Sequence, residues 1–193
     1  MERYKFLSEP FKRISCDCIE CTKYCLAMPG YLVPEDLYYI SKYLNLEISV
    51  DPNGNLDLSP LKDYLYASSG TIVKKQDEVF SIPTLVPATK PNGVCIFLDN
   101  DKRCSIHQVA PFGCSMFEDH GRYDIVYNYM STAATMMLAW IWKNEQTHPY
   151  YVLWHSLHKE GKTAINPAEA RLLMIERSLS YKTDNISIPI TFN

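Results

Sequence analysis

The chain has 193 residues, of which 47% are hydrophobic and 21% charged, so it is long enough to bury a core of its own. Its net charge of −3 and isoelectric point near 5.9 exclude a globally basic surface that would recruit nucleic acid or anionic lipid. The first ten residues have no apolar stretch of signal-peptide length, and the most apolar run, residues 133–142, is too short to span a bilayer. We therefore expect a cytoplasmic protein that binds neither membrane nor nucleic acid.

The first predicted helix begins at Pro34, because proline fixes φ there and two acids, Glu35 and Asp36, lie at the positive end of the helix dipole. It should end near Asn45. The apolar positions that the helical period places on one face are Leu37, Ile40, Tyr43 and Leu44.

The middle of the chain predicts turns and short strands. Residues 51–70 are rich in turn formers. Runs of β-branched and aromatic residues, each bounded by turn signals, predict strands at residues 71–73, 79–82 and 94–98. The prolines that interrupt the segment between the last two strands are Pro83, Pro87 and Pro91.

The last third predicts helices. One apolar stripe of helical period consists of Met130, Ala133, Ala134, Met137, Leu138 and Ile141. A further helix should start at Asn166, which can cap it, with Pro167 in the first position and Glu169 in the third. It should continue through Leu172, Leu173, Ile175 and Leu179.

These elements predict the α+β class, with a small irregular cysteine-rich core and short strands followed by a C-terminal helical region. We expect residues 1–125 to form the metal-binding domain and residues 126–193 the helical region packed on it, as one structural unit.

Seven cysteines carry the functional prediction. In a reducing cytosol they should not form a disulfide framework, and an odd number excludes complete pairing. The first group is Cys16, Cys18, Cys21 and Cys25, and the last three would share one face of a helix.

The second group is spread over residues 95–114. Cys95 lies on a predicted strand, the turn Asp99-Asn100-Asp101 follows, and Cys104 starts the return, so a hairpin would bring these two thiols together. Residues 111–113 would then turn Cys114 inward. Because several short-spaced thiols lie among polar neighbours, we interpret them as metal ligands rather than as buried apolar side chains.

The spacing also resembles a known family. The matching residues are Cys18-x2-Cys21-x3-Cys25, a helix opening at Pro34, Cys95-Ile-Phe-Leu-Asp99 and Cys104-Ser-Ile-His107-x3-Pro111-x2-Cys114-x2-Phe117. They look like the CxxCxxCC-type (YkgJ-like) cysteine-cluster family, described as zinc- or iron-chelating domains. The resemblance covers residues 16–120 and implies six ligands: Cys18, Cys21, Cys25, Cys95, Cys104 and Cys114.

Two departures from that family bear on the ligand set. Tyr24 precedes Cys25 where the family has adjacent cysteines, so one ligand is missing, and Cys16 is an extra thiol that can replace it. Ala110 and Ser115 occupy positions where the family often has arginine, so neutralisation of the thiolates must come from elsewhere. The nearby cations in the sequence are Lys23, Lys102 and Arg103.

Charge limits the nuclearity of the centre. Four thiolates leave a net charge of −2 on Zn²⁺ or on an oxidised [4Fe–4S]²⁺ cluster, whereas six on one Zn²⁺ would leave −4, which is prohibitive to bury. We therefore expect a four-sulfur site with spare thiols or a multinuclear site. His107 and His120 are additional ligand candidates, although a hydrogen-bonded or surface role is more common for histidine.

Spacing alone does not separate zinc from iron–sulfur chemistry. The resembled family includes flagellin lysine methylases, which favours an iron–sulfur cluster of the [4Fe–4S] type; zinc is the alternative. Three hypotheses follow: an iron–sulfur or iron centre used in a redox or modification reaction, a structural zinc module of an adaptor protein, and, ranked last, metal storage or delivery. The sequence has no phosphate-binding loop, dinucleotide fingerprint or serine-hydrolase motif, and it assigns no catalytic residue, substrate or protein partner.

Overall fold

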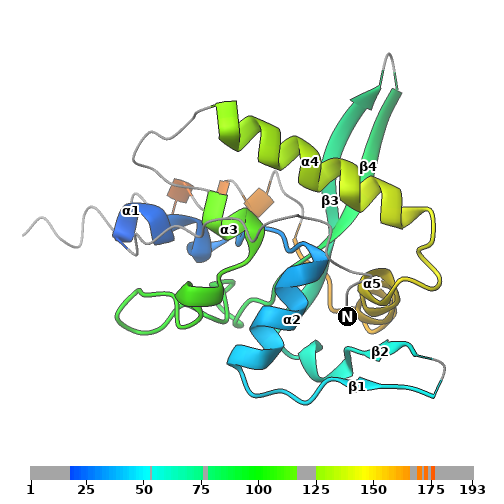
Figure 1. The fold of residues 1–193 in the computed structure, drawn as a ribbon. Coiled ribbons are helices and arrows are strands. Elements are labelled where there is room, and N and C mark those ends of the chain that lie inside the picture. Colours follow the sequence, from blue (N-terminus) through cyan, green and yellow to red (C-terminus); the bar gives the residue numbers. More distant parts are fainter. Residues whose placement is uncertain are drawn as a thin grey trace, which may run out of the picture.

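The computed structural model describes residues 18–52, 54–75, 78–116 and 125–165, together with 169–170, 172–173 and 175–176. Helices and short antiparallel strands give an α+β fold with helices in its C-terminal part, as predicted (Figure 1). The elements are α1 (Ile19–Thr22), η2 (Lys23–Leu26), α2 (Pro34–Tyr43), β1 (Ser49–Val50), β2 (Leu56–Asp57), η3 (Ser59–Leu61), β3 (Leu65–Lys75), β4 (Glu78–Pro87), η4 (His107–Val109), α3 (Phe112–Met116), α4 (Ile125–Trp142) and α5 (Pro149–Lys159).

Strands β3 and β4 form one long antiparallel hairpin that contains the first two predicted strands. The prediction that Pro83 interrupts the chain is wrong, because β4 runs through it. Pro83 lies in β4 opposite the register shift between Ser68 and Thr71 of β3. It is not part of the regular pairing there, so the ladder does not require the N–H that proline lacks. Gly70 occupies the same irregularity with φ of +86°, a conformation that favours glycine.

The third predicted strand, residues 94–98, is wrong. The segment forms two successive turns with single bridges, Thr89 to Cys95 and Leu98 to Cys104. The first turn closes through the Lys90 amide, which donates to the Val94 carbonyl at 2.7 Å. Because the chain folds back on itself twice between Thr89 and Cys104, residues 94–98 cannot extend as a strand.

The turn-rich segment contains a small sheet that the sequence did not predict. Strands β1 and β2 pair antiparallel around the turn that begins at Asp51. The amide of Asn55 donates to the Asp51 carboxylate at 2.8 Å. This hairpin is therefore closed by a polar side chain and not marked by alternating apolar residues.

Helix α2 confirms the predicted start at Pro34 and ends at Tyr43, close to the predicted Asn45. Leu37 and Ile40 are buried as expected. Tyr43 is exposed although it follows the same helical period, whereas Leu44 is partly buried and packs against the core.

Helices α4 and α5 pack against the β3–β4 hairpin, and their buried residues join the same hydrophobic core as α2 and β4. Tyr150 on α5 is the central connection. Its hydroxyl donates to the Leu32 carbonyl at 2.7 Å and accepts from the Leu85 amide at 2.7 Å. One phenol thus joins α5, β4 and the segment that leads into α2.

Within the apolar stripe of α4, Ala134, Met137, Leu138 and Ile141 are buried, as predicted. Residues 169–170, 172–173 and 175–176 are helical, while the predicted cap of that helix lies outside the described residues. No helix in the described part of the chain is both long and apolar enough to cross a membrane. The proposed division at residue 125 stays a prediction.

Candidate metal centre

A pocket of about 40 Å³ between α1, α3 and the two turns of residues 88–104 is the candidate site. Five cysteines from three separate segments line it: Cys21, Cys25, Cys95, Cys104 and Cys114. All five are sequence-predicted ligands. In Figure 1 the blue α1 and the green α3 lie side by side, which shows how segments about 90 residues apart meet here.

The first segment presents two of its three described cysteines to the pocket. Helix α1 runs directly into the 3-10 helix η2, and Cys21 and Cys25 are one turn apart across that junction. Cys18 is the N-cap of α1, in extended conformation, and is not among the pocket-lining residues. The sequence predicted that one helical face would carry Cys18, Cys21 and Cys25. In the structure, two of them, Cys21 and Cys25, line the pocket.

Cys25 and Cys95 form the close pair of the site. The backbone amide of Cys95 donates to the Cys25 carbonyl at 2.7 Å, which joins the first segment to the turn. Their thiols are also hydrogen-bonded. That bond, together with burial, raises the pKa of Cys25, and the same bond lowers the pKa of Cys95 against the opposing effect of burial. Cys25 is accordingly the donor and Cys95 the sulfur that carries negative charge more readily.

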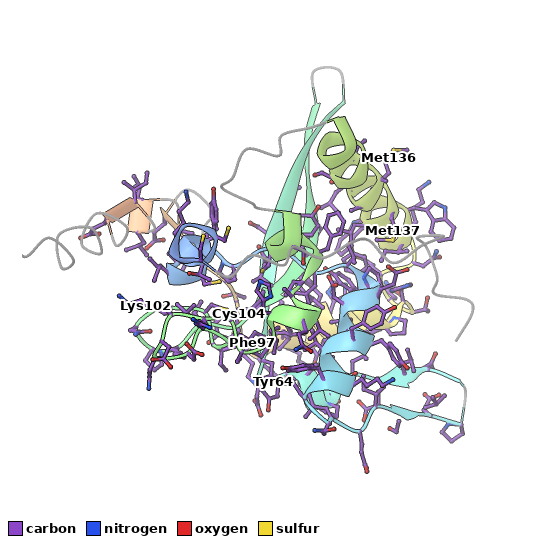
Figure 2. The ribbon with its side chains drawn as sticks, turned by 60° about the vertical axis from the view of Figure 1, so that its left-hand side comes forward. Tyr64, Phe97, Lys102, Cys104, Met136 and Met137 are labelled. Carbon is purple, nitrogen blue, oxygen red and sulfur yellow. The ribbon has the colours of Figure 1, made fainter. Side chains whose placement is uncertain are left out.

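Backbone amides support the sulfurs of both turns. The amides of Phe97 and Leu98 donate to Cys95 and lower its pKa, and the amide of Ile106 does the same for Cys104. Burial nevertheless raises the pKa of Cys104 to about 11. In Figure 2, Cys104 and Phe97 lie at the base of the green loop and Lys102 lies farther out along it.

Cys114 is positioned by two glycines. The Gly30 amide donates to the Cys114 sulfur at 3.2 Å, and the Gly113 amide donates to the Tyr31 carbonyl at 2.8 Å. A Cβ at Gly30 would lie 2.2 Å from the Cys114 nitrogen, and one at Gly113 would lie 2.4 Å from the Tyr31 nitrogen. Only glycine at both positions lets the backbones approach closely enough to hold this sulfur in the pocket.

Asp36 connects the same region to α2. One oxygen of its fully buried carboxylate accepts from the amides of Val33 and Phe112, both at 2.8 Å. The start of α3 is thereby fixed to the start of α2. Burial raises the pKa of the Cys114 thiol well above its ordinary value, and the Asp36 charge adds to that rise.

The remaining candidates fall into two groups. His107 lines the pocket with Thr22 and Ser115, so it stays within reach of a metal there. Cys16 and His120 lie outside the described residues. Sequence reasoning expected residues 111–113 to turn Cys114 inward but missed Gly30 and Lys90, whose roles depend on contacts made only in the folded chain.

The donor set fits a thiophilic metal or an iron–sulfur cluster, since buried thiols with N–H···S hydrogen bonds are the ligands and supporting groups that such centres use. In the described part of the chain, no three Cys, His, Asp or Glu side chains are grouped so that they could hold a metal ion as they stand. Neither a protein-family model, a curated protein nor a solved structure matches this chain.

Proposed function

We propose that the chain is a metal-binding protein of the reducing cytosol that holds an iron–sulfur or iron centre through Cys25, Cys95, Cys104 and Cys114. The observation that carries the proposal is the shared pocket, in which cysteines from three distant segments meet. Backbone amides already donate to three of these sulfurs, Cys95, Cys104 and Cys114. To hold the centre, these four cysteines would bind as deprotonated thiolates.

In this proposal the cysteines and the neighbouring backbone amides have different roles. The four cysteines bind the centre, and Cys21 lies beside them as a fifth thiol of the lining. The amides of Phe97, Leu98, Ile106 and Gly30 stabilise negative charge on the sulfurs. An iron–sulfur centre would supply electron transfer or substrate activation there.

Structural zinc is the second candidate, and one observation favours it. The hydrogen-bonded thiols of Cys25 and Cys95 are a close pair. Tetrahedral zinc with Zn–S bonds of about 2.3 Å also requires its sulfurs close together, roughly 3.8 Å apart. A four-iron cluster separates its thiolates further, because each binds a different iron. In the zinc version the centre would stabilise an adaptor fold.

Metal analysis with an absorption spectrum of anaerobically purified protein tests both. Iron with inorganic sulfide in brown protein supports the first proposal. Colourless protein with one tightly bound zinc per chain supports the second and contradicts the first. Cys104→Ser should remove most of the metal in either case, with Ser105→Ala as a matched control in the same turn. Protein with no bound metal that also fails reconstitution with iron and with zinc contradicts both.

A further inference from the structure

The described lining of the pocket contains no lysine or arginine side chain. Four thiolates around a divalent ion or a [4Fe–4S]²⁺ cluster carry a net charge of −2, and partly buried charge of that size is costly without a positive partner. Ala110 and Ser115, which lie in the wall beside Cys114, are uncharged. Among the described residues, a counter-charge would therefore have to act from behind the wall.

Lys90 is placed to provide it. The residue opens the first turn, in which the Gly93 amide donates to the Lys90 carbonyl at 2.7 Å. Its partly buried side chain folds back along that turn, and its Nζ donates to the Leu98 carbonyl. The amide of the same Leu98 donates to the Cys95 carbonyl at 3.1 Å, so the ammonium is fixed within the loop that carries Cys95.

Two charges of the described residues that act on the thiols are negative. Asp99 lies close enough to Cys104, and Asp36 to Cys114, to disfavour their thiolates electrostatically. The positive charge of Lys90 acts in the opposite direction, favouring the thiolate of Cys95. Lys23, which the sequence also suggested, lies 5.3 Å from the centre of the Tyr24 ring and so has an aromatic partner.

We propose that Lys90 is a positioning residue of the metal centre: its ammonium, anchored on the Leu98 carbonyl, supplies positive charge that offsets the thiolates. The inference rests on the proposed function, because without a charged centre there is nothing to offset. It adds a residue outside the cysteine motifs and explains how a pocket wall without lysine or arginine tolerates anionic ligands.

The test compares three variants of the full chain by anaerobic titration of the metal-free protein with Co²⁺, followed by Zn²⁺ competition. Lys90→Met should bind about tenfold more weakly, as expected for the loss of one partly buried charge interaction. Lys90→Arg should restore most of the affinity. Lys143→Met removes the same charge from an exposed position after α4 and should bind as wild type does. Thermal unfolding of each metal-free variant reports whether the fold is kept.

Where the purified protein carries an iron–sulfur cluster, the reduction potential is a second readout. Lys90→Met should make it more negative, because the removed charge favours the electron-rich state, while a purely structural role would leave it unchanged. Two results would overturn the role of the charge without touching the proposed function. One is wild-type metal affinity in Lys90→Met, and the other is an equal loss of affinity in Lys90→Arg and Lys90→Met. Failure of the wild type to bind any of these metals would instead overturn the proposed function.

Discussion

Two regions of the molecule, the core around α5 and the cysteine pocket, are held together in different ways. The α5 core buries aromatic side chains whose polar groups have protein partners: the Tyr151 hydroxyl donates to carbonyls of Pro83 and Leu138, and the Trp154 indole to that of Ser68. The cysteine pocket buries thiols whose ionisation the surroundings oppose at Cys25, Cys104 and Cys114. The α5 core is thus joined by hydrogen bonds from its aromatic side chains, whereas the cysteine pocket gathers the thiols to which we assign a metal centre in our proposal.

The largest expected effect is from Gly30→Ala, which should break the pocket. The new Cβ meets backbone atoms of Gly113 and Cys114 at 2.2 Å, so the two segments must separate. We expect a loss of about 4 kcal/mol in unfolding free energy, beyond the usual range for overpacking, together with loss of bound metal. Denaturant unfolding and metal analysis measure both.

Gly54→Ala is the matched control for that change. Gly54 has φ of +84° but open space around its Cβ position, so it should lose only about 1 kcal/mol and keep its metal. Full stability and metal content in Gly30→Ala would contradict the close approach of the two segments.

Tyr150→Phe should break the α5 core instead. It leaves the buried Leu85 amide and Leu32 carbonyl without their hydroxyl partner, at a cost of about 3 kcal/mol in unfolding free energy. Metal bound per folded chain should stay unchanged, because neither Tyr150 nor its partners Leu32 and Leu85 are among the described pocket-lining residues. Tyr43→Phe, on an exposed side chain, should change neither quantity. Equal loss of metal in Tyr150→Phe and Gly30→Ala would mean that the regions do not behave separately.

The pH dependence of the metal-free protein sharpens the comparison. The Cys104 pKa is raised from 9.0 to about 11, so the unfolded chain ionises first as pH rises. Stability should be intact below pH 9 and fall between pH 9 and 11, by at most about 2.7 kcal/mol from this thiol. Cys25 and Cys114 act in the same direction and Cys95 in the opposite one. Cys104→Ser should flatten the fall; a slope as steep as that of wild type would contradict the assignment.

The smallest effect should come from Cys18→Ser. Cys18 is not among the pocket-lining residues, so we expect wild-type metal content and a change in unfolding free energy below about 0.5 kcal/mol. Cys25→Ser is the comparison at the other end of the same segment and should lose the metal. An equal loss of metal in Cys18→Ser and Cys25→Ser would contradict this expectation and indicate that Cys18 is a ligand.

Local sequence signals predicted α2, α4 and parts of β3 and β4, but not α5 or the β1–β2 sheet. Proline and two acids located α2, period-3.6 apolar residues located α4, and β-branched runs located β3 and β4. The errors arose where non-local contacts decide: residues 94–98 have strand-like composition, but bonds from Cys95 to Cys25 and across two tight turns fold them back. Propensity does not include such contacts.

For the site, cysteine spacing predicted which thiols to examine, and five of the six expected ligands line one pocket. Their supporting groups could not be predicted in the same way. Gly30 and Lys90 lie outside the cysteine motifs. Gly30 matters because its amide donates to the Cys114 sulfur 84 residues away, and Lys90 because its side chain folds back onto the Leu98 carbonyl. The metal family suggested by the motifs stays a prediction.

The meeting of segments so far apart has a consequence for biosynthesis. Cys21 leaves the ribosome 93 residues before Cys114, a delay of roughly 5–20 seconds at about 5–20 residues per second. During that interval the first thiols have neither the later turns nor α3 to enclose them. The metal site that we propose is complete only after synthesis has passed α3, so we expect loading to follow folding of the chain rather than begin it.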